Sequence, residues 1–181
     1  MRYFEKISKY KDRDDIILPV RSTIGSAGYD FFAIEDINIY PIFPISFDTG
    51  FLYKSPELVF DEANYTDKKY EDIEPCYCTL VKTGIKAYMP EDEYLGLFIR
   101  SSLAMKYGLS LVNNCGIVDS SYYNNSSNEG EIGFLIINFN TKTYHIKKGD
   151  KIGQGIFMKY LITKDDNVNI VRQGGFGSTG I

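Results

Sequence analysis

Residues 94–112 read YLGLFIRSSLAMKYGLSLV, and this stretch decides how the rest of the chain is interpreted. Its two ends, 94–99 and 109–112, are short runs of bulky apolar residues, which predict β-strands. Between them, Ser101 and Ser102 precede a helix-forming run that stops at Gly108. Serine is a favoured N-cap and glycine a favoured helix stop, so the stretch predicts one short helix between two strands.

Similar short apolar runs recur along the chain. They predict further strands at 37–45, 78–86, 132–139, 151–160 and 167–171. Turn-forming residues separate these runs, as at 90–92, 148–150 and 165–167. Many short strands with one short helix are typical of an all-β barrel or sandwich. The 181 residues are enough for a single domain with a sizeable core.

The composition limits the kinds of partner. The formal net charge of −4 and the pI of about 5.1 argue against a nucleic-acid polymer or an anionic membrane as the main partner. A small phosphorylated ligand needs only local cations and is not excluded. The N-terminus is charged and no apolar run approaches about twenty residues, so we expect a cytoplasmic protein with no signal peptide or spanning segment.

Cysteine and histidine usage indicates no metal or redox motif. The chain has three cysteines, Cys76, Cys78 and Cys115, and a single histidine, His145. The Cys-Tyr-Cys spacing fits neither a zinc knuckle nor a redox Cys-x-x-Cys pair. We therefore interpret the cysteines as reduced, buried thiols and expect neither thiolate–metal nor serine–histidine chemistry.

Two stretches have the composition of insertions. Residues 43–75 scatter apolar side chains among many acidic ones, and residues 123–129 read YNNSSNE, a polar loop by composition. We interpret both as additions on the surface of the domain.

The C-terminal tail predicts a binding segment for a phosphorylated ligand that carries a base. Residues 172–180 read RQGGFGSTG. Glycines at this density let backbone N–H groups converge on an anion. Arg172 adds a cation that can form a forked pair with phosphate oxygens, and Phe176 adds a flat face for a nucleobase.

Four internal clusters place polar groups beside turns or predicted strands. They are SAGYD at 26–30, RSSLA at 100–104, NNCGIVDSSY at 113–122 and GDKIGQ at 149–154. The second cluster puts a cation and two hydroxyls at a predicted helix N-terminus, where unpaired N–H groups favour phosphate. Each cluster alone also has a structural interpretation: Arg100 as a surface ion pair, Asp119 as a turn residue, Tyr122 as core packing.

In their order, the clusters and the tail resemble the five signature motifs of the trimeric dUTPases. The motifs are Ala-Gly-Tyr-Asp, Arg-Ser-Ser-Leu-Ala, Gly-Ile-Val-Asp-x-x-Tyr, Gly-Asp-x-Ile-x-Gln and Gly-Gly-Phe-Gly-Ser-Thr-Gly, and they span residues 16–180 apart from the two insertions. The resemblance implies a distorted jelly-roll β-barrel at 1–171 and a flexible, glycine-rich lid at 172–181. It also implies a homotrimer with active sites at subunit interfaces, and Mg²⁺-dependent hydrolysis of dUTP to dUMP and pyrophosphate.

The resemblance also implies a role for single residues. Asp119 stands where the family has the general base that activates water for attack on the α-phosphorus. Tyr122 stands where an aromatic ring packs beneath the deoxyribose and excludes a 2′-hydroxyl. The positions that correspond to the uracil pocket are Asn113, Ile117, Val118 and Gly133.

The remaining assigned positions concern the triphosphate and its metal ion. Those that correspond to phosphate-binding residues are Arg100, Ser101, Ser102 and Gln154. Asp30 corresponds to the carboxylate that helps to hold Mg²⁺ through its water shell. In the tail, Phe176 would cover the uracil, while Arg172, Gly177 and Ser178 would reach the outer phosphates.

Two alternatives stay open at this point. A dCTP deaminase shares the barrel and favours Arg-Ser-Ser-Leu-Ala, but it needs a glutamate proton shuttle where this chain has Leu135. A regulatory module derived from a dUTPase could bind a repressor protein, with the acidic segment 43–75 as the contact surface for a basic partner.

Overall fold

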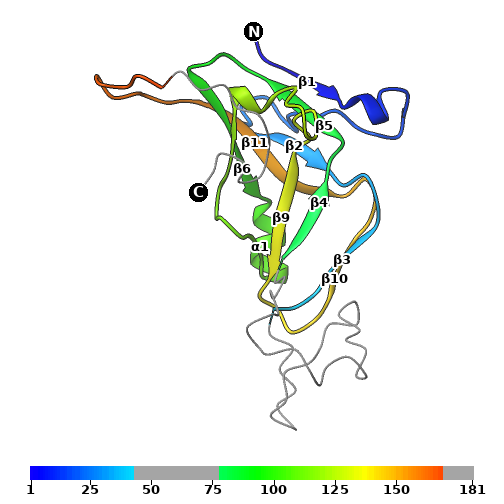
Figure 1. Cartoon of the computed structure of the whole chain (residues 1–181). Coiled ribbons are helices and arrows are strands. Elements are labelled where there is room, and N and C mark those ends of the chain that lie inside the picture. The colour runs from blue at the N-terminus through cyan, green and yellow to red at the C-terminus, as the bar shows by residue number, and fades with distance from the viewer. Residues whose placement is uncertain (43–77, 169–181) are drawn as a thin grey trace, which may run out of the picture.

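The computed structural model describes residues 1–42 and 78–168, and short strands are the main regular secondary structure in this part of the chain (Figure 1). The strands are β1 (Tyr3–Lys6), β2 (Tyr29–Phe32), β3 (Ile37–Ile39), β4 (Thr79–Lys82), β5 (Ile85–Tyr88), β6 (Glu93–Ile99), β7 (Leu109–Leu111), β8 (Gly116–Asp119), β9 (Gly133–Asn138), β10 (Tyr144–Ile146) and β11 (Lys151–Lys159). One α-helix, α1 (Ser101–Tyr107), joins β6 to β7. The prediction of an all-β architecture with one short helix is confirmed.

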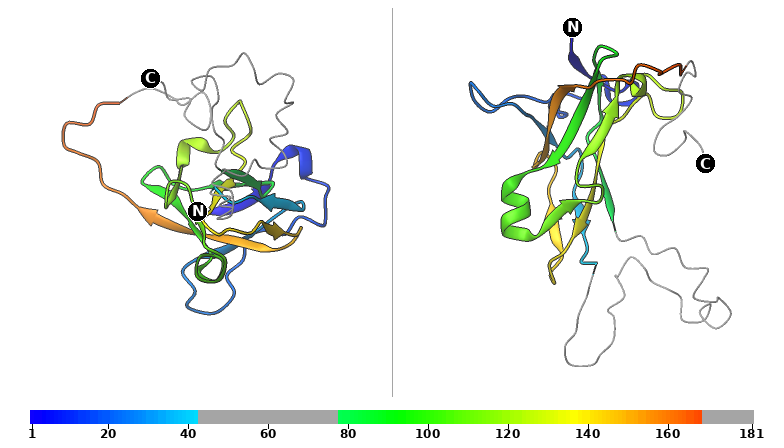
Figure 2. Two further views of the ribbon diagram at one scale, coloured as in Figure 1. Left: turned by 90° about the horizontal axis from the view of Figure 1, so that it is seen from below. Right: turned by 90° about the vertical axis from the view of Figure 1, so that its left-hand side faces the viewer.

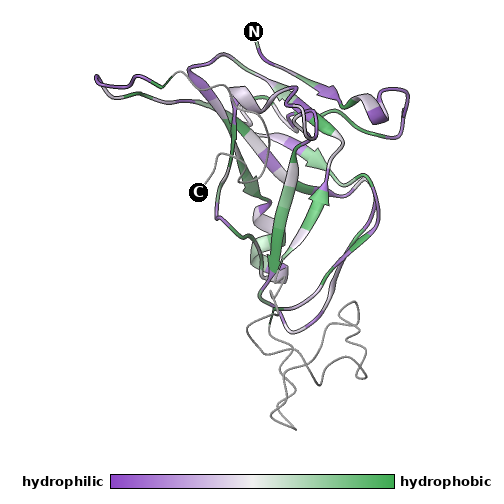
Figure 3. Cartoon of the chain, in the orientation of Figure 1, coloured by the Kyte–Doolittle hydropathy of each residue, from purple (hydrophilic) through white to green (hydrophobic). Residues whose placement is uncertain are grey.

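The strands pair into four small antiparallel sheets around one core (Figure 2). Their strand orders are β2-β11-β6-β8, β4-β9-β7, β1-β5 and β3-β10. Apolar residues gather on the strands and polar residues in the connections (Figure 3). Along β9 the pattern is strict, because Phe134, Ile136 and Asn138 are buried while the intervening residues are only partly buried.

The two largest sheets are joined by close aromatic packing. The ring of Phe134 on β9 lies 5.5 Å from that of Phe31 on β2, centroid to centroid. A Cβ atom on Gly153 of β11 would come within 2.2 Å of the Phe134 ring. Gly153 therefore has to be glycine so that the Phe134 ring can pass over β11.

The structure of α1 confirms the predicted stop at Gly108 and corrects the predicted serine N-cap. Gly108 ends α1 in the left-handed conformation, with φ 64°, and its N–H donates to the carbonyl of Ala104. The N-cap is Arg100 rather than a serine, and no side chain caps the helix there. Ser101 and Ser102 already occupy the first and second helical positions, so their hydroxyls come one and two residues too late to act as the N-cap.

Several strand predictions are wrong in detail. The sequence indicated no strand at β1, β2, β8 or β10, because these are short and carry charged or polar residues. The predicted strand 78–86 is divided at Gly84, whose φ of +67° turns the chain from β4 in one sheet to β5 in another. Of the predicted strand 167–171, Asn167 and Val168 are not in a strand, and the other residues lie outside the described residues.

The polar loop 123–129 is more than a surface addition. Asn125 is buried inside it, and its side chain bonds to groups within the loop and to the carbonyl of Tyr122. Cys78 and Cys115 are partly exposed, whereas the sequence predicted buried thiols. The acidic insertion 43–75 and Cys76 lie outside the described residues. No helix in the described part of the chain is long and apolar enough to cross a membrane.

Candidate active site

A cavity of about 230 Å³ opens between β8 and β9. Its walls come from five segments of the chain and are mostly apolar or backbone; they are Leu97, Leu111, Asn113, Gly116, Ile117, Val118, Tyr122, Glu131, Ile132, Gly133 and Leu135. All five positions assigned to the uracil and the deoxyribose are among them. The structure therefore brings Asn113, Ile117, Val118, Tyr122 and Gly133 together, although twenty residues of sequence separate the first from the last.

The strands explain why backbone groups face this cavity. Among the described residues, β8 is the last strand of its sheet and pairs on one side only, with β6. Its other edge therefore keeps backbone N–H and C=O groups that can bond a ligand. On the opposite wall, Gly133 and Leu135 lie on the face of β9 that points away from the buried Phe134 and Ile136. A Cβ on Gly133 would come within 2.6 Å of the Leu80 side chain.

Tyr122 is held in the wall of this cavity by the burial of its ring and by the hydrogen bonds of its hydroxyl. Its ring is buried, with 6% exposure, and it lies in the 3₁₀ turn Ser120–Tyr122 directly after β8. Its hydroxyl donates to the carbonyl of Glu131 at 3.1 Å and accepts from Nδ2 of Asn128 at 2.7 Å. The core-packing interpretation of Tyr122 is therefore partly correct, but one face of the residue borders the cavity.

Asp119 stands at the rim of the same region. It is the last residue of β8, it is exposed, and its immediate neighbour Val118 lines the cavity. Across the sheet it lies opposite Tyr94, which is close to the start of β6. An exposed carboxylate next to an apolar cavity can reach both a bound ligand and solvent water.

A second hollow of about 220 Å³ lies at the N-terminus of α1 and is rich in cations. Arg100 and Ser102 line it, together with Lys106 and Lys151. The rings of Tyr107 and Tyr144, which also line it, lie 4.4 Å apart between centroids. Ser101, the other predicted hydroxyl, is exposed at the first position of α1 and does not line this hollow.

Asp30 and Gln154 face each other across β2 and β11. The Asp30 carboxylate accepts from Nζ of Lys151 at 2.7 Å and from the hydroxyl of Ser22, and within the described residues both bonds reach Oδ2. Gln154 is paired with Asp30 in the ladder, and its side chain lies over Gly28. A Cβ at residue 28 would come within 2.4 Å of the Gln154 amide oxygen, so this contact requires the glycine of the Ala-Gly-Tyr-Asp motif.

The Lys151 contact changes the ionisation of Asp30. Burial raises the pKa of this carboxyl, but the hydrogen bonds from Lys151 and Ser22 and the charges of Lys151 and Arg100 lower it, and the net effect is a lowered pKa. Asp30 is therefore a carboxylate at neutral pH. The described part of the chain contains no group of three or more His, Cys, Asp or Glu side chains that could hold a metal ion.

Replacing Lys151 gives a pH-dependent loss of stability. We expect Lys151→Met to destabilise the protein by about 1 kcal/mol at pH 7, because it removes the ion-pair partner of a largely buried carboxylate. The folded-state pKa of Asp30 is lowered, so the pair contributes stability above the unfolded pKa of about 4 and loses it as the pH falls through the folded pKa. In urea unfolding, the difference from the wild type should therefore disappear at low pH.

The control for this prediction lies on the same strand. Lys159 at the other end of β11 pairs with Asp92, but the two side chains are 72% and 57% exposed. Lys159→Met should change the free energy of unfolding little at any pH. A loss of stability in Lys151→Met that stays constant down to pH 2 would show that the ion pair is not its cause.

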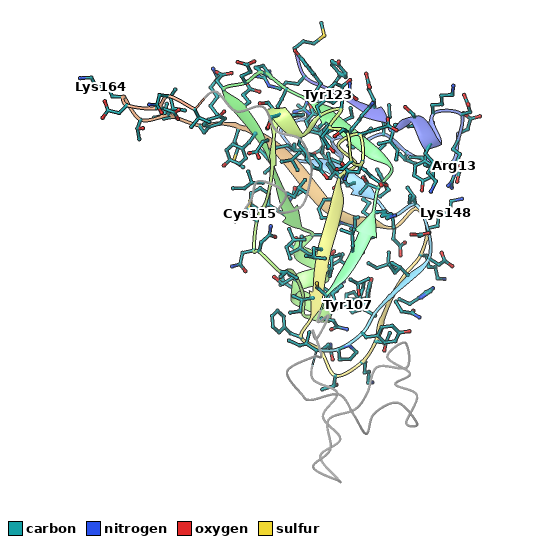
Figure 4. The ribbon with its side chains drawn as sticks, viewed as in Figure 1. Arg13, Tyr107, Cys115, Tyr123, Lys148 and Lys164 are labelled. Atoms are coloured by element: carbon teal, nitrogen blue, oxygen red, sulfur yellow. The ribbon has the colours of Figure 1, made fainter. Side chains whose placement is uncertain are left out.

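Asp119 and Arg100 lie far apart in one chain. Asp119 lies beside Tyr94, whereas Arg100 directly follows Ile99 at the opposite end of β6. At about 3.3 Å per residue, roughly 20 Å of strand separates them. In Figure 4, Tyr107 of the second hollow lies near the bottom of the described part and Tyr123, four residues after Asp119, lies near the top. Thus one chain brings together the base and sugar positions, but it does not bring Asp119 to Arg100.

Some residues of both hollows were not predicted from the sequence. In the first, Glu131 and Leu135 could have been found from the alternation of residues 131–137 that follows the Tyr122 motif. In the second, Lys151 lies inside the Gly-Asp-x-Ile-x-Gln motif, but at one of its variable positions. The predicted tail residues Arg172, Phe176, Gly177 and Ser178 lie outside the described residues.

Comparison with known proteins agrees with the geometry. The family model described as dUTPase matches residues 68–180. The deoxyuridine 5'-triphosphate nucleotidohydrolase of Lactococcus lactis subsp. lactis (strain IL1403) is 36% identical over 182 residues, covering 99% of this chain and 98% of that protein. The enzyme of the same name from Clostridium novyi (strain NT) is 27% identical over 181 residues, covering 97% of this chain and 99% of that protein.

Solved structures show the same fold. The crystal structure of dUTPase from Streptococcus mutans is similar with a TM-score of 0.65 and 33% identity, covering 90% of this chain and 98% of that one. The dUTPase from phage phi11 of S. aureus has a TM-score of 0.60 at 17% identity, covering 94% and 97% of the two chains, and it supports the fold alone. The jelly-roll barrel implied by the five motifs is confirmed, and the chain belongs to the dUTPase family.

Proposed function

We propose that the protein hydrolyses dUTP to dUMP and pyrophosphate. The observation that carries this proposal is the single cavity between β8 and β9, which gathers all the positions assigned to the uracil and the deoxyribose. Family membership supports the same substrate. The dCTP deaminase alternative loses support, since the family is now shown and Leu135, which cannot transfer protons, borders the cavity.

The cavity has the features that uracil selection requires. The unpaired edge of β8 offers backbone donors and acceptors in fixed positions, and Asn113 adds an amide at the cavity wall. Cytosine carries a donor and an acceptor where uracil has an acceptor and a donor, so it would leave buried groups facing the wrong partner. Such mismatches are the strongest discrimination that a pocket can make. Tyr122, whose ring cannot easily move, would pack beneath the sugar and leave no room for a 2′-hydroxyl.

The chemical step assigned to Asp119 is general-base catalysis. The carboxylate accepts a proton from a water molecule as its oxygen attacks the α-phosphorus. A bond forms between the water oxygen and the α-phosphorus, and the bond from the α-phosphorus to the α–β bridging oxygen breaks. The electron pair leaves with pyrophosphate, and the water oxygen stays in dUMP.

The cation-rich hollow would hold the phosphates. Arg100 can form forked hydrogen bonds with phosphate oxygens, and Ser102 can donate its hydroxyl. We propose that Asp30 helps to hold Mg²⁺ through the ion's water shell. A magnesium ion bound chiefly by substrate phosphates takes only one or two protein carboxylates, so a single ionised Asp30 fits it. When bound, the ion would neutralise phosphate charge and orient the triphosphate.

Because Asp119 and Arg100 are about 20 Å apart along β6 in one chain, we propose that these two residues combine across chains in a homotrimer. A triphosphate whose α-phosphorus lies near Asp119 would then meet Arg100 of the neighbouring subunit. The tail roles proposed for Arg172, Phe176, Gly177 and Ser178 rest on the sequence motif. The protein partner proposed for segment 43–75 also stays a prediction from its acidic composition.

The test of this proposal uses the purified protein alone. With dUTP and Mg²⁺, equal amounts of dUMP and pyrophosphate should appear, and excess EDTA should stop their release. In H₂¹⁸O, the heavy oxygen should be found in dUMP, because attack occurs at the α-phosphorus. Label in the pyrophosphate would mean attack at the β-phosphorus, and the absence of turnover would contradict the proposed function.

A further inference from the structure

The loop 123–129, one of the two insertions seen in the sequence, is bonded directly to the proposed sugar-binding residue. Nδ2 of Asn128 donates to the hydroxyl of Tyr122 at 2.7 Å. This bond is shorter than the one that the same hydroxyl donates to the carbonyl of Glu131, which is 3.1 Å long. The phenol is thus held between two groups rather than by packing alone.

Asn128 is itself rigidly placed. Its Oδ1 accepts from Nδ2 of Asn125 at 2.8 Å and from the N–H of Gly130 at 3.1 Å. Asn125 is buried, and its own Oδ1 accepts three bonds from Ser127 and Asn128. Because both ends of the Asn128 amide are used, the orientation of its Nδ2 toward Tyr122 is fixed.

The backbone closes the loop tightly against Tyr122. Gly130 has φ +84°, and a Cβ there would come within 2.6 Å of the carbonyl oxygen of Tyr122. On the outer side, the loop is bonded to β5, since the buried Lys86 donates to Asn124 at 2.6 Å and pairs with Glu129. Glu129 also accepts from the N–H and hydroxyl of Ser8.

The second partner of the phenol is equally fixed. The segment that carries the Glu131 carbonyl is bonded to the turn between β4 and β5. The hydroxyl of Thr83 donates to the carbonyl of Ile132 at 2.6 Å, and the N–H of Ile132 donates to the carbonyl of Ile85 at 2.8 Å. Any movement of the Tyr122 side chain that carries its hydroxyl away from this position therefore breaks hydrogen bonds to two fixed groups.

We propose that Asn128 is a positioning residue that holds the Tyr122 ring against the sugar and so sets the discrimination between dUTP and UTP. This inference rests on the proposed function. A ring free to tilt would open space for a 2′-hydroxyl, whereas a ring fixed at its hydroxyl keeps that space closed. The insertion then acts on sugar selection without touching the nucleotide.

The experiment is a double-mutant cycle read as the ratio of kcat/KM for dUTP to kcat/KM for UTP. Tyr122→Phe keeps the ring and removes its hydroxyl, and Asn128→Ala removes the donor. Each should lower the ratio by about three- to tenfold, the range expected for one hydrogen bond. The double variant should be no worse than Tyr122→Phe alone, because the bond that Asn128→Ala breaks is one of the two already lost with the hydroxyl.

Ser127→Ala is the matched control. The Ser127 hydroxyl donates to Asn125 in the same loop, whereas the loop's hydrogen bond to the Tyr122 hydroxyl comes from Asn128. The control variant should leave the ratio unchanged. A general loss of folding would lower turnover of both nucleotides and leave the ratio where it was. An unchanged ratio in Asn128→Ala, or additive losses in the double variant, would overturn the inference while the wild type still hydrolysed dUTP.

A second readout does not depend on turnover. The mobility of the Tyr122 side chain about its Cα–Cβ bond, measured by NMR on protein with labelled tyrosine, should rise in Asn128→Ala and stay as in the wild type in Ser127→Ala. An unchanged mobility in Asn128→Ala would also overturn the inference. A wild-type protein that released no dUMP would instead contradict the proposed function.

Discussion

Asp119→Asn should lower kcat for dUTP by about 10²–10⁴, the range expected for loss of a general base. Asparagine keeps the shape of the side chain but cannot accept the proton of the attacking water. Asp119 is exposed at the end of β8 and contributes no wall to the base cavity, so binding should survive the change. The dissociation constant for dUpNHpp, an imido analogue of dUTP, should stay within about threefold of the wild type, as for a group used only in the transition state.

Asp92→Asn is the control for this prediction. Asp92 is also an exposed aspartate, in the turn before β6, where it pairs with Lys159. Its replacement should leave turnover unchanged. Turnover close to that of the wild type in Asp119→Asn would remove Asp119 from the mechanism, and a large loss of analogue binding would assign it to substrate binding instead.

Mixing two inactive variants should restore activity. In the proposed shared site, Asp119 would come from one chain and Arg100 from its neighbour. Neither Asp119→Asn nor Arg100→Met should be active alone. After subunit exchange in an equal mixture, about a quarter of the sites in cyclic trimers should combine an intact Asp119 with an intact Arg100.

The same mixture tests the alternative directly. If each chain held a complete site, every site would keep one defect and mixing would restore nothing. Light scattering on the mixture should give the mass of three chains. A monomeric mass in an active wild-type preparation would contradict the shared site. Methionine keeps much of the aliphatic length of Arg100, so circular dichroism should show an unchanged fold in that variant.

The sequence predicted the strongly patterned elements well and the short ones poorly. β6, α1 and β7 lie where residues 94–112 placed them, because long apolar runs and the glycine stop are local signals. β1 and β8 depend on partners far along the chain: Tyr3 pairs with Tyr88, and Tyr94 with Asp119. Their strand character comes from these pairings, which no local pattern encodes.

The same difference holds for the candidate site. The Gly-Ile-Val-Asp-x-x-Tyr motif identified the cavity between β8 and β9, because Gly116, Ile117, Val118 and Tyr122 line it. The sequence could not show that Lys151 neutralises Asp30, since this contact joins residues 121 positions apart. It also gave the loop 123–129 no role, because a polar composition does not distinguish a solvated loop from one whose amide side chains bond each other and Tyr122.

The central claim is that the cavity between β8 and β9 selects a uracil base on a deoxyribose. The most direct test is to measure kcat/KM of the wild-type protein for dUTP, dCTP, dTTP and UTP under one set of conditions. The account predicts that dUTP exceeds each of the others by at least about a hundredfold, because every competitor leaves a polar group unpaired or meets a fixed wall. Comparable values for dUTP and UTP, or for dUTP and dCTP, would contradict it.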